Sequence, residues 1–187
     1  MEAFLVSTGI VALAEMGDKT QLLAILLATR FRKPWPIVAG IFAATVANHL
    51  LAASLGALVA AHVDPDWLRW ILAASFIAMG LWILVPDKAD DEAADNGKRK
   101  LGVFLTTAIA FFLVEMGDKT QVATVALAAR FGNAVLVTLG TTFGMMLANV
   151  PAVFLGEAVT RVVPLAVVRA VSAAIMIAVG VATFFVV

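Results

Sequence analysis

Long apolar stretches alternate with short polar segments along the whole chain. A helix needs about 20 residues to cross the hydrocarbon core of a bilayer, and six of the apolar stretches are long enough to do so. They lie at residues 4–28, 36–60, 67–85, 102–129, 134–158 and 165–187. The pattern therefore predicts an all-α membrane protein with six transmembrane helices.

The polar segment at residues 86–100 is the longest separator between these stretches. It contains five acidic and four basic residues and has no apolar periodicity, which is typical of a solvated linker. We expect this charged linker to lie in the cytoplasm and to join two halves, residues 1–85 and 101–187.

The two halves are copies of one another. The sequence EMGDKTQ at residues 15–21 recurs at residues 115–121, and the shift of 100 residues also relates Gly80 to Gly180. Three spans per copy is an odd number, so the second copy must enter the membrane from the opposite side. The repeat therefore predicts two inverted three-helix repeats, as in many secondary transporters, whose substrate site lies near the midplane between the repeats.

The basic residues predict the orientation in the membrane. Nine of them gather on one predicted face: Arg30, Arg32, Lys33, Lys88, Lys98, Arg99, Lys100, Arg161 and Arg169. The opposite face has only Arg69 and Arg130. Because loops rich in Lys and Arg stay in the cytoplasm, we expect a multi-pass protein of the inner cell membrane with both termini extracytoplasmic.

The amino-acid composition indicates which kinds of binding partner the protein can have. Hydrophobic residues make up 63% of the 187 residues and charged residues 14%, against about 45–50% and about 25% in soluble domains, so the surrounding partner is the lipid bilayer. A net charge of zero argues against nucleic acid. The absence of cysteine excludes disulfides and thiolate metal sites. The sequence indicates no particular oligomeric state.

Charged residues lie inside the first and fourth predicted spans. They are Glu15, Asp18, Lys19, Glu115, Asp118 and Lys119. Each one costs about 2.5–3.5 kcal/mol or more to insert into a bilayer, which indicates a functional site. In a helix, Glu15 and Asp18 share one face, and Gln21 lies three residues further along the same stripe. The glycine between them, Gly17, allows the helix to open at this point.

The two motif copies together supply oxygen ligands and a net negative charge. Four carboxylates, the amides of Gln21 and Gln121 and two ammonium groups sum to a formal charge of −2, which one divalent cation neutralises. Such ligands suit Mg²⁺, Ca²⁺ or Mn²⁺ better than Cu⁺ or Zn²⁺. Crowded carboxylates also take up protons when a metal leaves, which is a physical basis for antiport. The alternative is a pair of buried Asp–Lys staples, which leaves the glutamates unexplained.

Both copies of the pattern E-x-G-D-K-[ST] resemble the signature of the small membrane family of Mn²⁺/Ca²⁺:H⁺ exchangers. That family includes bacterial manganese exporters and Golgi manganese/calcium transporters, and is grouped with the cation/Ca²⁺ exchanger superfamily. The resemblance covers the whole chain. It implies export of a divalent metal, with Mn²⁺ as the expected cargo and Ca²⁺ as the alternative, in exchange for protons by alternating access. The metal is the substrate and the proton the coupling ion, so no cofactor is expected.

The resemblance also implies roles for residues of the motif. The acids of the family signature bind the metal, which implies this role for Glu15, Asp18, Glu115 and Asp118. Gln21 and Gln121 are implied as supporting ligands. Thr20 and Thr120 either cap a broken helix turn or bind the metal. Lys19 and Lys119 are expected to act as internal counter-ions that replace the cation charge when the metal is absent.

Other polar residues recur at matched depth in the second and fifth spans. Asn48 and Asn149 correspond with a shift of one residue, as metal ligands or as interhelical hydrogen-bonding groups. His49 has no counterpart, because Val150 follows Asn149. A metal ligand, a proton relay and a core residue all remain open for this histidine.

Two other functions use buried carboxylates. An intramembrane carboxylate-dependent hydrolase would use them for acid–base chemistry. However, the motif has Glu where Gly-x-Gly-Asp proteases have their first Gly, and the chain has no tyrosine for their second motif. A passive divalent cation channel would use the same site without proton coupling. We therefore expect a transporter rather than an enzyme.

Overall fold

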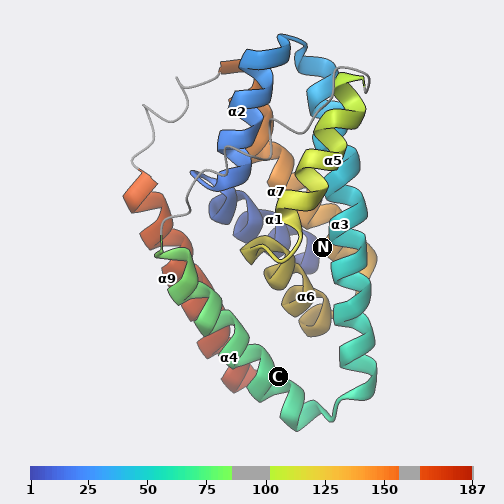
Figure 1. The fold of residues 1–187 in the computed structure, drawn as a ribbon. Coiled ribbons are helices and arrows are strands. Elements are labelled where there is room, and N and C mark those ends of the chain that lie inside the picture. The colour runs from blue at the N-terminus through green and yellow to red at the C-terminus, as the bar shows by residue number, and fades with distance from the viewer. Residues whose placement is uncertain (86–101, 156–164, 187) are drawn as a thin grey trace.

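The computed structural model describes residues 1–85, 102–155 and 165–186, and these residues fold into helices joined by short turns (Figure 1). The helices are α1 (Glu2–Glu15), α2 (Lys19–Phe31), α3 (Pro34–His62), α4 (Pro65–Ile83), α5 (Val103–Glu115), α6 (Lys119–Phe131), α7 (Ala134–Leu155) and α9 (Leu165–Val186). The all-helical prediction is confirmed. The predicted linker at 86–100 and the end of the fifth predicted span, at 156–158, lie outside the described residues.

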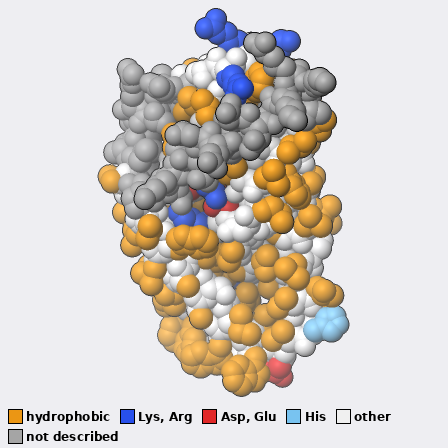
Figure 2. Space-filling model, viewed as in Figure 1, with side chains coloured by type: hydrophobic (Ala, Val, Ile, Leu, Met, Phe, Trp, Pro, Cys, Tyr) orange, Lys and Arg blue, Asp and Glu red, His pale blue; other side chains and the backbone are white. Residues whose placement is uncertain are grey.

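Three helices, α3, α4 and α7, are each long and apolar enough to cross a membrane. Two shorter apolar helical segments accompany them, Val103–Glu115 and Ala170–Phe185. Large apolar side chains cover much of the visible surface of the described residues (Figure 2), and Trp35 and Phe185 are 72% and 77% exposed. Water-soluble monomers rarely expose apolar surface on this scale, so the chain is a multi-pass membrane protein.

The first and fourth predicted spans are each broken into two helices. Glu15 ends α1, and its carbonyl accepts the Asp18 N–H at 3.1 Å across a tight turn. Met16 has φ −67° and ψ 112°, and Gly17 has φ +81°, which are the angles of a type II turn that favours glycine at its third position. The same turn breaks α5 from α6, with Gly117 at φ +79°.

This break corrects one sequence-based expectation and confirms another. Glu15 and Asp18 were expected on one face of a continuous helix, but they lie on either side of a turn, so helical spacing does not relate them. The predicted opening of the helix at Gly17 is confirmed. The physical reason is the backbone conformation with positive φ, which interrupts the helical hydrogen bonds and which glycine adopts without steric cost.

In each half, one helix packs against a helix of the other half, and the two contacts are equivalent. A Cβ atom on Gly140 of α7 would lie 2.5 Å from the Phe4 carbonyl oxygen in α1. A Cβ atom on Gly40 of α3 would lie 2.7 Å from the Phe104 carbonyl oxygen in α5. Each pair of residues is related to the other by the shift of 100. The duplicated glycines therefore let α1 approach α7 in the same way as α5 approaches α3, so that each half packs into the other.

Helices α4 and α9 form a pair beside the other helices, green and red in Figure 1. Gly80 of α4 lies against Ile177 of α9, and Gly180 of α9 lies against Ile77 of α4. Moving forward along α4 thus corresponds to moving backward along α9, so the two helices are antiparallel. This is the arrangement that a two-fold axis perpendicular to both helices produces.

Candidate metal centre

Three carboxylates from the two motif copies meet in the interior of the protein. Glu15 ends α1, Glu115 ends α5 and Asp118 precedes α6, and each offers an oxygen within 4.8 Å of the oxygens of the other two. Their exposed fractions are 0%, 0% and 3%. Asp18 is also buried, in the equivalent position before α2, but it is not part of this group of three. The helix breaks thus bring acids 100 residues apart to one place.

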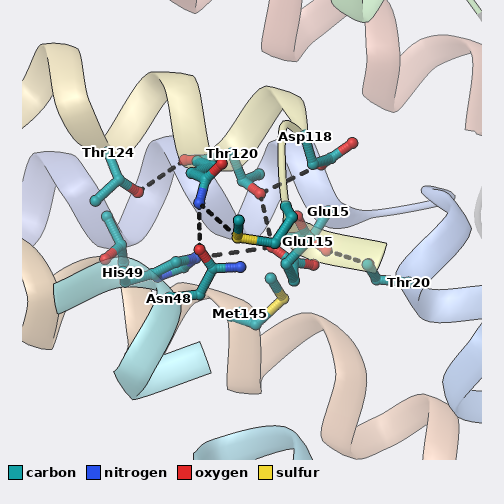
Figure 3. Close-up of polar contacts among 12 residues, drawn as sticks. Glu15, Thr20, Asn48, His49, Glu115, Asp118, Thr120, Thr124 and Met145 are labelled. Atoms are coloured by element: carbon teal, nitrogen blue, oxygen red, sulfur yellow. Dashed lines mark hydrogen bonds and ion pairs between the residues drawn. The ribbon is translucent and has the colours of Figure 1, made fainter. Parts of the chain in front are cut away.

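Threonines hydrogen-bond to these carboxylates (Figure 3). The Thr20 hydroxyl donates to Glu15 Oε2. The Thr120 hydroxyl lies 3.3 Å from Glu115 Oε2 and 3.4 Å from Asp118 Oδ2. One oxygen of each carboxylate is therefore oriented by a threonine. The other glutamate oxygens, Oε1 of Glu15 and of Glu115, are buried and have no hydrogen-bond partner among the described residues.

Buried carboxylate oxygens without a partner are costly, because the interior offers nothing to replace the lost water. A bound cation or a proton would satisfy both of them. With a bound metal, Thr20 and Thr120 would position the carboxylates. Direct binding of the metal by the threonine oxygens stays a prediction.

The two glutamines of the motif hold the helix breaks together. Gln21 Oε1 accepts the Gly17 N–H at 2.9 Å, and Gln121 Oε1 accepts the Gly117 N–H at 2.7 Å. Gln21 Nε2 also donates to the Ala148 carbonyl of α7 at 3.1 Å. Because the turn exposes a backbone N–H that the helix no longer pairs, the glutamine replaces that bond. Asp18 and Gln21 have the spacing of a helix capping box in the sequence, but Gln21 accepts from the Gly17 N–H, one residue before the N-cap, and Asp18 makes no side-chain cap bond among the described residues.

The asparagines differ between the two halves. Asn48 Oδ1 accepts a hydrogen bond from Gln121 Nε2, and Asn48 Nδ2 lies 3.5 Å from the Phe112 carbonyl. Asn149 Nδ2 donates to the Met145 carbonyl at 3.2 Å, and its buried Oδ1 has no hydrogen-bond partner among the described residues. Asn48 therefore acts as a link between α3, α5 and α6, while the Asn149 oxygen is available to a ligand.

The lysines of the motif contact groups far away in sequence. Lys19 Nζ lies 3.0 Å from Asp118 Oδ1, which joins the first half to the second. Lys119 Nζ lies 3.3 Å from the Val85 carbonyl and 5.9 Å from the centre of the Trp82 ring. The sequence predicted a counter-ion role, and the Lys19–Asp118 pair has the geometry for it. The sequence could not identify the partner as the aspartate of the other copy.

His49 of α3 also reaches the carboxylates. Its Nε2 lies 3.9 Å from Glu115 Oε2, and the ring is fully buried. Neither ring nitrogen has a hydrogen-bond partner among the described residues. The sequence left a metal ligand, a proton relay and a core residue open for His49, but it did not predict the contact with Glu115.

A buried carboxylate cluster at two equivalent helix breaks, enclosed in an apolar helical protein, defines a secondary transporter of cations. Residues 3–91 and 103–186 both match the family model described as divalent cation/proton antiporter GDT1, and the chain belongs to this family. The family is described as one of antiporters, that is, of transporters and not of enzymes.

Several curated proteins resemble the chain over most of its length. A protein of Vibrio cholerae serotype O1 named "Putative manganese exporter" is 50% identical over 186 residues, covering 99% of this chain and 92% of that protein. A GDT1-like protein of Synechocystis sp. is 28% identical over 176 residues, covering 84% of each chain. GDT1-like protein 5 of Arabidopsis thaliana is 28% identical over 193 residues, again covering 84% of each. No solved structure matches the chain.

Proposed function

We propose that this protein exports Mn²⁺ from the cytoplasm in exchange for protons, by alternating access around the buried carboxylate cluster. The observation that carries the proposal is the convergence of Glu15, Glu115 and Asp118, whose oxygens lie within 4.8 Å of one another. Carboxylate oxygens are ligands that suit Mn²⁺, Ca²⁺ and Mg²⁺. The name of the Vibrio relative favours manganese among these, and Ca²⁺ is the second candidate.

The charges near the cluster suit a divalent cation. When ionised, the four acids of the two motif copies carry −4, and Lys19 and Lys119 carry +2, so the sum is −2. One divalent ion neutralises this charge, and two protons neutralise it equally well. In an interior of low dielectric constant an uncompensated charge is expensive, so the site favours one occupant or the other. Exchange of one metal ion for two protons follows from this competition.

The proposed membrane arrangement has six spans in two inverted repeats, with α1–α2 and α5–α6 as the broken spans. Two features support an inverted relation between the halves. Helices α4 and α9 are antiparallel, and the contact between α1 and α7 is repeated by the equivalent contact between α5 and α3. Broken helices at a midplane site are the usual binding elements of inverted-repeat transporters. The distribution of basic residues then places both termini outside the cytoplasm, in the inner cell membrane.

The test uses the purified chain in proteoliposomes with an imposed pH gradient. Mn²⁺, Ca²⁺ and Mg²⁺ are supplied in turn, and proton movement and metal uptake are recorded together. The decisive variants are Glu15→Gln, Glu115→Gln and the double variant, which keep the side-chain volume and one oxygen but remove a charge. Glu2→Gln is the matched control, because Glu2 lies at the exposed start of α1.

We expect each substitution in the cluster to reduce Mn²⁺-driven proton flux to the level of empty liposomes, while Glu2→Gln keeps the wild-type rate. Folding should survive, since a neutral amide costs less in an apolar interior than the ion it replaces. Wild-type exchange in the Glu15→Gln, Glu115→Gln double variant would locate the transport site elsewhere in the protein.

A further inference from the structure

The motif carboxylates explain an oxygen site, but they do not explain why a histidine adjoins it. We propose that His49 is a nitrogen ligand of the transported ion and the residue that makes the site prefer a transition metal over Ca²⁺ and Mg²⁺. This inference rests on the proposed function and adds a specificity-determining residue to the same site.

The first supporting observation is the position of the ring. Donor atoms that bind one ion at about 2.0–2.6 Å lie no more than about 5 Å apart. His49 Nε2 and Glu115 Oε2 are 3.9 Å apart, which is within that limit and too long for a hydrogen bond. Figure 3 shows the ring directed from α3 toward Glu115. The two atoms therefore have the spacing of two ligands that share an ion on the Glu115 side of the cluster.

The second observation is the unsatisfied state of the imidazole. Both ring nitrogens are buried without a hydrogen-bond partner among the described residues, and the side chain is 0% exposed. A histidine that serves only as a core residue loses its hydrogen bonds to water and gains nothing in return. A metal ion at Nε2 would supply the missing partner of that nitrogen.

The third observation comes from the repeat. The shift of 100 that relates Gly40 to Gly140 places Asn149 of α7 at the position equivalent to His49 of α3. The Asn149 Oδ1 is also buried without a hydrogen-bond partner among the described residues, so both halves direct an unpartnered polar atom inward at this position, and only the first half supplies a nitrogen. The nitrogen adds something that the four carboxylates, duplicated in both halves, do not provide.

The chemistry of that addition is selectivity. Imidazole nitrogen binds first-row transition metals well, whereas Ca²⁺ and Mg²⁺ prefer oxygen ligands only. A site of carboxylates alone would bind all three kinds of ion. Replacing one oxygen position by nitrogen retains a transition metal and weakens the hard alkaline-earth ions, which are far more abundant competitors.

A spectroscopic experiment tests the ligation directly. The chain has two histidines, so His62→Gln leaves His49 as the only imidazole, and His62 lies exposed at the end of α3. The full chain with ¹⁵N-labelled histidine is loaded with Mn²⁺ in nanodiscs, and electron spin echo modulation reports nitrogen coupled to the metal. We expect ¹⁵N coupling in the wild type and in His62→Gln. Bound Mn²⁺ without ¹⁵N coupling in both proteins would overturn the proposal.

Transport competition tests the selectivity. Mn²⁺ uptake is measured with increasing Ca²⁺ in wild type, His49→Gln, His49→Val and His62→Gln. Loss of a group that only supports a metal ligand already costs about 10- to 100-fold in metal affinity, so we expect the Mn²⁺/Ca²⁺ preference to fall at least about 10-fold in both His49 variants and to stay unchanged in His62→Gln. A purely structural role would lower both ions' rates together and leave their ratio unchanged, which would contradict the inference.

The two proposals fail in different ways. If the wild-type protein neither binds Mn²⁺ nor couples it to protons, the proposed function is wrong. If the wild type exchanges Mn²⁺ for protons but the His49 variants keep its ion preference, only the role of His49 is wrong.

Discussion

The type II turn at Gly117 should be needed for transport because it places Glu115 next to Asp118. The perturbation is Gly117→Ala. A Cβ atom at this position would meet nothing within 4 Å, so the substitution introduces no steric clash. Its effect comes from the backbone alone, since Gly117 has φ +79°, a region that side chains other than glycine enter only at a cost.

That cost is about 1–2 kcal/mol for a residue with a Cβ atom in the left-handed region. Alanine also favours the continuous helix that competes with the turn. A change of this size alters a conformational equilibrium by about 5- to 30-fold. A continuous helix would move Asp118 away from Glu115, because the turn sets the spacing of these two residues. We therefore expect Mn²⁺-driven proton flux to fall about 5- to 30-fold in the Ala variant.

Two matched variants separate the turn from other effects. Gly117→Asn should retain more activity than Gly117→Ala, because asparagine tolerates the third position of a type II turn. Gly9→Ala lies inside α1, where a Cβ atom also meets nothing within 4 Å, and should leave transport unchanged while stabilising the helix by about 1 kcal/mol or less.

The assay is the initial rate of proton flux per folded transporter in proteoliposomes, with folding followed by thermal unfolding in detergent. A Gly117→Ala protein with wild-type flux and wild-type stability would refute the reasoning. It would mean that the turn is not what brings the carboxylates together.

Two further predictions concern the packing and the topology. Gly140→Ala should destabilise the protein by about 1–3 kcal/mol, because its Cβ atom would lie 2.5 Å from the Phe4 carbonyl oxygen; a melting temperature equal to that of Gly9→Ala would contradict this. The chain has no native cysteine, so a single cysteine replacing Asp95 should resist impermeant reagents applied outside intact cells and react after the membrane is opened; labelling from outside would reverse the proposed orientation.

The sequence alone predicted the helical elements well because their signal is strong. Apolar runs of membrane-spanning length allow few alternatives, and α3, α4, α7 and α9 begin or end within a few residues of the predicted spans. The helix breaks were harder to locate, because the apolar character continues through them. Only Gly17 and its copy mark the turn, and a glycine in a membrane helix often serves close packing instead.

The composition of the site was also more predictable than its contacts. The duplicated motif indicates which acids belong together, since odd-numbered inverted repeats bring equivalent positions to the midplane. It cannot indicate that Lys19 pairs with Asp118 of the other copy, or that Gln21 closes the turn at Gly17. Those contacts depend on the direction of the chain after the turn, which no periodic pattern specifies.

The motif performs two tasks with the same residues, and this accounts for its polar density. In an apolar environment a helix can be interrupted only where its freed backbone groups find new partners. Gln21 provides such a partner for the Gly17 N–H, and Thr20 orients the carboxylate that the interruption releases at Glu15. The buried carboxylate and the helix break that presents it are therefore built from one short segment. Its duplication yields two such breaks, and their carboxylates lie close together in the interior. The combined negative charge is more than the protein can stabilise there without a cation or protons.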